Sequence, residues 1–274
     1  MGLIDDIKSN AIENGTKIQN TETAEIEKLF NSLFYAKKNM DEEVKFVKQM
    51  FTRGGDCTDR RGLHTSAIIV GEDKFCYREQ VLSLLYEQAQ GENVPQNLIR
   101  IFEEGNAIHE KWQRLFIRGG LGVAEDMDFS KFYEQYEVGY TPDAILTIDG
   151  EKYVVEIKSV NTYQFQKMTS HPTATKQVNM YMHFTGIHKG IVLCDDKNTQ
   201  NFKVFMVKYS PDIVAPYIER LEAVQYYKER VLTEGKMVKR CTSCTSKVCK
   251  RAITCAMRDA CWNVGKGRVK LNGK

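Results

Sequence analysis

Apolar residues recur every three or four positions in the first half of the chain, the spacing of helices that bury one face. This spacing predicts two helices within 21–52, a helix over 76–89 and another over 96–117. Gly119 and Gly120 stand just beyond the last of these and are expected to end it. The stretch 53–62 is rich in glycine and charge, so it predicts a loop.

The period then changes to strand-like alternation, in two segments joined by Asp149-Gly150, a pair typical of two-residue hairpin turns. The predicted elements of this second half are strands 136–148 and 151–160, a helix from Pro172 to Phe184 ended by Gly186, strands 190–196 and 202–209, and a helix over 211–232. The order indicates an α/β or α+β fold with a small central mixed β-sheet flanked by helices.

Charge is unevenly distributed along the 274 residues, although the net charge is only +3. Residues 235–274 hold eleven Lys or Arg and a single acid, Asp259, whereas the remainder carries 28 bases and 35 acids. We therefore expect three parts: an N-terminal helical region (1–62), a core (63–234) and a basic, Cys-rich segment (235–274) that packs on the core. There is no apolar run of about 18 residues and no apolar signal core, which predicts a cytoplasmic protein without a membrane span.

The hairpin brings two carboxylates together. With Asp149 and Gly150 in the turn, Ile148 pairs with Glu151, and the same register places Asp143 opposite Glu156. Alternation puts Lys158 on the face of Glu156. Facing carboxylates repel, and Mg²⁺ or Mn²⁺ bound by their oxygens would remove that cost. A solvated charged face is the alternative, but the apolar flanks argue against it, and Pro142 suggests a bulge that aims Asp143.

The eight cysteines are also clustered, with five between positions 241 and 261. Without a secretory signal, metal binding is a better expectation than disulfides. Four thiolates serve zinc or an iron–sulfur cluster equally well, so the spacing leaves both open. The basic residues around them would suit a phosphate backbone, unless the tail is simply a solvated terminus.

Pro142-Asp143 followed by Glu156-Ile157-Lys158 resembles the signature of the PD-(D/E)XK nuclease superfamily. The match is to the RecB-type branch, which includes the CRISPR-associated Cas-four exonucleases, the AddB nuclease domain and many bacteriophage exonucleases. The resemblance covers about 66–262 and implies a restriction-endonuclease-like core. It implies that Asp143 and Glu156 hold the catalytic metal, and that Lys158 positions the attacking water.

Further residues match motifs of the same branch. Gly105 and His109 match a Gly-x-x-x-His helix whose histidine is an extra metal ligand, although a histidine on an apolar stripe is more often a core residue. The resemblance adds the Ile157 carbonyl as a ligand. Gln177 and Tyr181 match a Gln-x-x-x-Tyr motif on the following helix, which implies a role in phosphate contact or in bracing the site.

The branch also carries a four-iron, four-sulfur cluster held by one upstream and three C-terminal cysteines. Cys76, Cys255 and Cys261 match three of these positions, but residue 252 is Ala where the fourth cysteine would stand. Cys244 is favoured as the replacement, with Cys241 and Cys249 as alternates, and zinc stays the second choice of metal. Cys57 and Cys194 are expected to lie outside the set.

The resulting hypothesis is a Mg²⁺- or Mn²⁺-dependent deoxyribonuclease, an exonuclease acting on single strands or duplex ends. It would serve recombination, repair or replication, with a helicase or recombination protein as partner. In a phage-encoded protein it would act in the host cytoplasm. A structure-specific endonuclease on the same core, or a non-catalytic Cys-rich nucleic-acid-binding module, are the alternatives.

Overall fold

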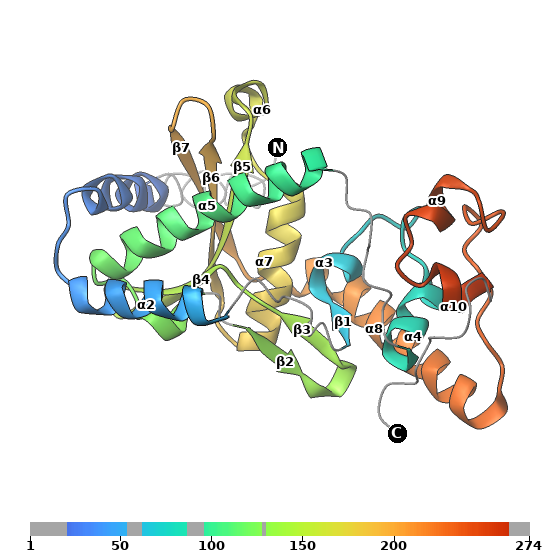
Figure 1. Cartoon of the computed structure of the whole chain (residues 1–274). Coiled ribbons are helices and arrows are strands. Elements are labelled where there is room, and N and C mark those ends of the chain that lie inside the picture. The colour runs from blue at the N-terminus through green and yellow to red at the C-terminus, as the bar shows by residue number, and fades with distance from the viewer. Residues whose placement is uncertain (1–20, 54–61, 87–95, 128–129, 263–274) are drawn as a thin grey trace, which may run out of the picture. The chain divides into compact units, whose positions relative to one another are not determined.

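The computed structural model describes residues 21–53, 62–86, 96–127 and 130–262 (Figure 1). These fall into two compact units. Unit 1 is formed by residues up to Arg53, Ile101–Phe129 and Pro142–Tyr209, and unit 2 by Gly54–Arg100, Ser130–Thr141 and Ser210–Lys274. No described helix has the length and apolar character needed to cross a membrane.

Unit 1 is built on a four-stranded sheet in the order β4-β5-β6-β7. Its strands are β4 (Ala144–Ile148), β5 (Glu151–Val160), β6 (Lys189–Asp196) and β7 (Phe202–Lys208). The β4–β5 and β6–β7 pairs are antiparallel, and β5 and β6 run parallel, so the sheet is mixed. The mixed α/β architecture predicted from the sequence is therefore confirmed.

The predicted hairpin register is also confirmed. Asp149 and Gly150 both have positive φ, 51° and 82°, as a two-residue hairpin turn with the twist of its strands requires. Ile148 pairs with Glu151 and Ala144 with Val155. This register fixes which side chains of β4 and β5 share a face.

Helices cover the sheet of unit 1. A helix over 21–33, α2 (Met40–Arg53) and α5 (Gln96–Arg118, in unit 1 from Ile101 on) supply residues to a core cluster with one face of the sheet. That cluster includes Trp112 and Phe116 of α5 with Val155 and Ile157 of β5. On the other face, α7 (Pro172–Thr185) packs against β5 and β6 and ends at Gly186, whose φ is 71°. The short elements η1 (Ala124–Asp126) and α6 (Thr162–Lys167) complete the unit.

One predicted strand is wrong. The segment 136–148 is not a continuous strand with a bulge at Pro142, because β3 (Val138–Tyr140) and β4 belong to different sheets. Pro142 lacks the N–H that a ladder needs, and it stands where the chain leaves one sheet for the other. The three-stranded sheet of unit 2, in the order β1-β3-β2, was not anticipated. Its other strands are β1 (Leu63–His64) and β2 (Lys131–Tyr133).

In unit 2 the C-terminal tail packs on α4 (Tyr77–Leu85), the helix that Cys76 directly precedes. Further helical elements are α3 (Thr65–Ile68), η2 (Glu134–Tyr136), α8 (Pro211–Glu234), α9 (Lys250–Ile253) and α10 (Arg258–Trp262). Leu82 of α4 forms a small core with Met257 and Cys261 of the tail. Residues 87–89 of the helix predicted over 76–89 lie outside the described residues, as do the predicted loop at 54–61 and Cys57.

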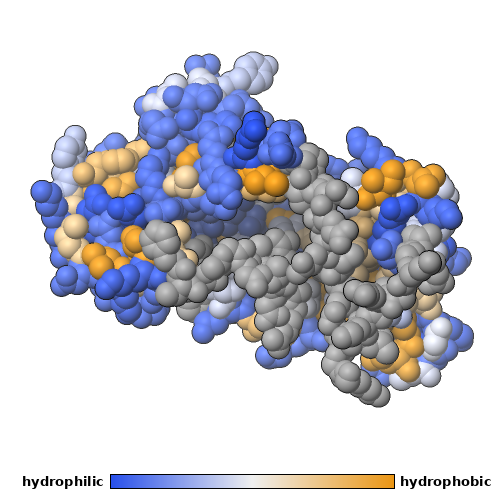
Figure 2. All heavy atoms as spheres, viewed as in Figure 1, coloured by the Kyte–Doolittle hydropathy of each residue, from blue (hydrophilic) through white to orange (hydrophobic). Residues whose placement is uncertain are grey.

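Figure 2 shows mostly hydrophilic residues on the visible face, with a hydrophobic patch over α9. Val248, just before α9, is 63% exposed, and Ile253, its last residue, is 60% exposed. Isolated apolar residues of this kind are ordinary on protein surfaces, and we assign the patch no function.

Candidate active site on the β4–β5 hairpin

Asp143 and Glu156 lie next to each other in unit 1, where the hairpin register predicted them. Asp143 directly precedes β4, and its N–H donates to the Val155 carbonyl at 3.1 Å. Both side chains are withdrawn from solvent, with Asp143 8% and Glu156 2% exposed. The alternative of a solvated charged face is therefore wrong for these two carboxylates.

Burial controls the ionisation of Glu156. The loss of solvent, together with the charge of Asp143, raises the pKa of the Glu156 carboxyl to about 8. Its Oε1 accepts a short hydrogen bond from the Lys158 ammonium, whereas its Oε2 is buried without a hydrogen-bond partner. A buried carboxylate oxygen with no donor is costly, and a bound cation or a proton would satisfy it.

His109 projects from α5 towards Asp143. Its Nδ1 lies 3.1 Å from Asp143 Oδ1, and 31% of its side chain is exposed. Burial favours the neutral imidazole, but the adjacent Asp143 carboxylate outweighs it and raises the pKa of His109. The histidine is thus a partner of the carboxylate, and the alternative of an apolar core histidine does not hold.

Lys158 connects the carboxylates to α7. Its Nζ contacts Gln177 Oε1 at 3.3 Å, and Gln177 Nε2 donates to the Tyr181 hydroxyl at 2.7 Å. Val154 and Gly190 are paired, and α7 packs on this face of the sheet, which is the face of Glu156 and Lys158. The structure therefore brings together all six predicted side chains: His109, Asp143, Glu156, Lys158, Gln177 and Tyr181.

Two residues outside the predicted set also lie at this site. Gln113 of α5 is 1% exposed and donates from Nε2 to the Asp143 carbonyl at 2.8 Å. His171 caps α7, accepting from the Ala174 N–H at 3.2 Å, and burial and the charge of Lys158 lower its pKa. The one available hint for Gln113 is its position four residues after His109, which places both on one helical face.

Asp143, one of the predicted metal ligands, is already bonded to a protein donor. The Asp143 Oδ2 accepts from the Ile157 N–H at 2.6 Å, and Ile157 itself is buried in the sheet. Across the described part of the chain, no three or more His, Cys, Asp or Glu side chains are grouped so that they could hold a metal ion. Metal ligation by His109, Asp143, Glu156 and Ile157 stays a prediction.

Five of the predicted cysteine ligands and alternates line one pocket in unit 2: Cys76, Cys241, Cys244, Cys255 and Cys261. Cys249 is not among its lining residues. Its sulfur accepts from the Ala252 N–H at 3.4 Å and caps α9, and its thiol is hydrogen-bonded to that of Cys244, which lines the pocket. Cys194 is buried in β6 of unit 1. The seven described cysteines are all free thiols.

Charged and thiol groups within this pocket pair with one another. The thiols of Cys76 and Cys241 are hydrogen-bonded, and Arg251 binds both the Cys241 sulfur and the Glu79 carboxylate. Burial, followed by the neighbouring Glu79, raises the pKa of Cys255 to about 12. Burial also raises the pKa of Cys241, but hydrogen bonds from Ser243, Cys76 and Arg251 outweigh it, so the net shift is downward.

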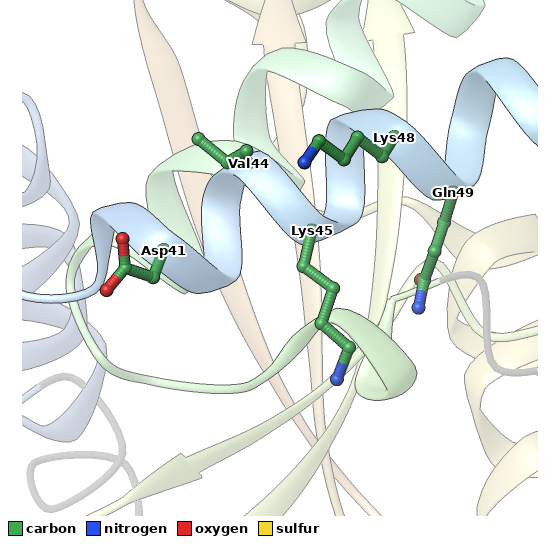
Figure 3. A pocket seen from close by; sticks show the side chains of 5 residues that line it. All are labelled: Asp41, Val44, Lys45, Lys48 and Gln49. Carbon is green, nitrogen blue, oxygen red and sulfur yellow. The ribbon is translucent and has the colours of Figure 1, made fainter.

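A further surface pocket lies along α2 in unit 1 (Figure 3) and is lined by Asp41, Val44, Lys45, Lys48 and Gln49. Lys45 pairs with Glu125 at 2.5 Å. The residues that line the pocket include a single carboxylate, so the chemistry of the paired acids is not repeated there.

Comparisons with known proteins give weak matches in structure alone. The sequence matches no protein-family model and no curated protein. A crystal structure described as SSO0001 aligns over 79% of this chain and 94% of its own, at 12% identity and a TM-score of 0.40. The alkaline exonuclease LHK-Exo from Laribacter hongkongensis aligns over 63% and 90%, at 15% identity and a TM-score of 0.41. LHK-Exo in complex with dAMP aligns over 64% and 91%, at 15% identity and a TM-score of 0.42. Values this low do not assign an activity to this chain.

Proposed function

We propose that the hairpin site hydrolyses phosphodiester bonds of DNA with the help of Mg²⁺ or Mn²⁺. The observation that carries the proposal is the pair of buried carboxylates, Asp143 and Glu156, with the Lys158 ammonium bonded to one of them. Removing charged groups from water is unfavourable, so a cluster of two buried acids and an ammonium seldom adds to stability. Such clusters are more typical of functional sites.

The donor set suits a hard divalent cation. Carboxylate oxygens are the ligands that Mg²⁺ and Mn²⁺ prefer, and the unpartnered Glu156 Oε2 is available for one. Asp143 and Glu156 would hold the metal, with His109 and the Ile157 carbonyl as further ligands. When bound, such a metal lowers the pKa of a water and stabilises negative charge on a phosphate.

The chain's own residues would orient the reactants. Lys158 is held between Glu156 and Gln177, so its ammonium is fixed where it could position a water or a phosphate oxygen. Tyr181 holds Gln177 through its hydroxyl and thereby restrains Lys158 in turn. We infer the exonuclease activity on single strands or duplex ends from the resemblance to the RecB-type branch.

We further propose that the cysteine pocket holds an iron–sulfur cluster, with zinc as the second choice. Five thiols line it, and Arg240, Arg251 and Arg258 also line it, so cations are present to compensate thiolate charge. Seven free cysteines are what a reducing compartment such as the cytoplasm maintains. The basic tail would contact DNA phosphates, and a helicase or recombination protein is the partner we infer.

The test uses the full chain with end-labelled single-stranded and duplex DNA in Mg²⁺ or Mn²⁺. Asp143→Asn and Lys158→Met should each lower the cleavage rate by about 100-fold or more, the loss expected for groups that stabilise transition-state charge. Asp149→Asn is the matched control, because it makes the same change at the exposed turn of the same hairpin and should cleave normally.

Cleavage by wild-type protein that persists in both site variants would overturn the assignment. Circular single-stranded DNA separates the two nuclease classes, since an exonuclease needs an end and an endonuclease does not. DNA binding without any cleavage by the wild-type protein would instead support the non-catalytic binding module.

A further inference from the structure

Gln113 is a buried side chain that reaches the backbone of Asp143. It lies one helical turn after His109 on α5, is 1% exposed, and donates to the Asp143 carbonyl at 2.8 Å. We propose that Gln113 is a positioning residue that fixes the direction of the Asp143 carboxylate. This inference rests on the proposed function and adds a residue that the nuclease motifs do not contain.

All four polar atoms of Asp143 are engaged, and Gln113 is the side chain that engages the carbonyl. The N–H donates to Val155, Oδ2 accepts from the Ile157 N–H, and Oδ1 faces His109. Two residues of α5 therefore contact Asp143: Gln113 bonds to its backbone carbonyl, and His109 contacts its carboxylate.

The backbone at this point needs such support, because Asp143 lies outside regular strand. β3 ends at Tyr140, β4 begins at Ala144, and Pro142 has no N–H to donate. Rotation of the peptide after Asp143 would turn its Cα–Cβ bond and move the carboxylate away from Glu156. The bond from Gln113 opposes that rotation, and its loss would also leave a buried carbonyl without this donor.

A purely structural role for Gln113 is the competing explanation, and its neighbour provides the comparison. Trp112 is also buried on α5, and its Nε1 donates to Asp195 Oδ2 at 2.8 Å. Both residues make a buried hydrogen bond from α5 to the sheet region, and the bond from Gln113 is to a proposed metal ligand. Trp112→Phe therefore removes a comparable buried hydrogen bond of α5 and leaves the contacts of Asp143 unchanged.

The experiment compares Gln113→Met with Trp112→Phe in the full chain. Methionine keeps the length of glutamine and removes the donor. For Q113M we expect kcat on a labelled single strand to fall by about 10- to 100-fold, with KM for DNA within twofold. The affinity of the protein alone for Mn²⁺, measured by calorimetry, should fall by a similar factor. W112F should lose stability to urea yet keep kcat and Mn²⁺ affinity within twofold.

A second variant covers the case in which Q113M does not fold. Gln113→Glu keeps the shape but places a carboxylate oxygen against the Asp143 carbonyl, so it should show the same losses near neutral pH. Its activity relative to wild type should recover as the pH falls, because a protonated glutamic acid donates again.

The results distinguish this inference from the proposed function. An active, Mn²⁺-binding wild type with Q113M or Q113E no more impaired than W112F would overturn the positioning role alone. A wild-type protein that neither cleaves DNA nor binds Mn²⁺ would overturn the proposed function and this inference with it.

Discussion

Glu156 is the residue at which stability and the proposed function would be coupled. Its carboxyl is 2% exposed, one of its oxygens has no hydrogen-bond partner, and Asp143 lies beside it. Burial and this neighbour favour the protonated form and raise the pKa to about 8. In the proposed function, a proton and a divalent cation would therefore compete for the same carboxylate.

The raised pKa predicts how stability without divalent metal depends on pH. Between pH 4.5 and 8 the folded protein keeps a proton on Glu156 that the unfolded chain releases, so stability due to this group falls as pH rises. In EDTA, the urea midpoint of wild type should decline across this window. Glu156→Gln should flatten the decline, and equal slopes in the two proteins would contradict the assignment.

Metal affinity should change in the opposite direction. Binding at Glu156 must displace its proton, so the apparent affinity for Mn²⁺ should rise with pH until about pH 8 and then level off. Calorimetry in two buffers with different protonation enthalpies measures the proton released per metal bound. If metal binding releases no proton at pH 6.5, the metal does not displace the proton of Glu156.

At the scale of elements, the sequence predicts what depends on local chemistry. Asp149-Gly150 needs positive φ at both residues, which determines the hairpin register and thereby the meeting of Asp143 and Glu156. Gly186 ends α7 for a similar reason. Features that depend on residues far apart in the sequence have no such local signal. Two examples are the division of 136–148 between two sheets and the hydrogen bond from Gln113 of α5 to Asp143.

The cysteines illustrate the same limit. Their number and spacing predict a shared site, and five of them line one pocket. Cys249 caps α9 beside the pocket instead of lining it, and the contact of Cys76 with Cys241 depends on how the tail packs on α4. Neither follows from spacing, because the connecting segments could place several cysteines near Cys76.

The packing of α7 on β6 depends on Gly190, which leads to an element-scale prediction. A Cβ at this position would lie 2.3 Å from Val178 Cγ1 and 3.3 Å from Met182 Sδ. Gly190→Ala should therefore reduce the free energy of unfolding by ~1–3 kcal/mol through overpacking. In a urea double-mutant cycle, Val178→Ala should relieve part of the cost, and strictly additive losses would contradict this account.

At the scale of the whole molecule, the net charge of +3 conceals two different units. Both carboxylates of the proposed catalytic site belong to unit 1, whereas the basic tail and its thiols belong to unit 2. Residues 235–274 contain eleven Lys or Arg, so DNA affinity supplied by the tail should be strongly salt-dependent. We therefore propose that unit 1 carries out the hydrolysis and that unit 2, stabilised by its bound metal, contacts the DNA.

The thiol pocket provides the test of that division, because a bound cluster would join α4 to the tail. Cys76 directly precedes α4, and the other four lining thiols lie within 241–261. Anaerobically purified protein should show thiolate-to-iron absorbance, and Cys76→Ser should abolish it. The same variant should expose the tail to limited proteolysis while unit 1 stays resistant, because only unit 2 loses its crosslink.

Cys249→Ser is the matched control, since serine also caps a helix and the Cys249 sulfur lies outside the pocket lining. C249S should therefore keep the absorbance and the resistant tail. Loss of iron in C249S would make Cys249 a ligand and require the tail to rearrange around the metal. A colourless wild type with one zinc per chain would replace the cluster by a tetrahedral site, which needs only four of the five thiols.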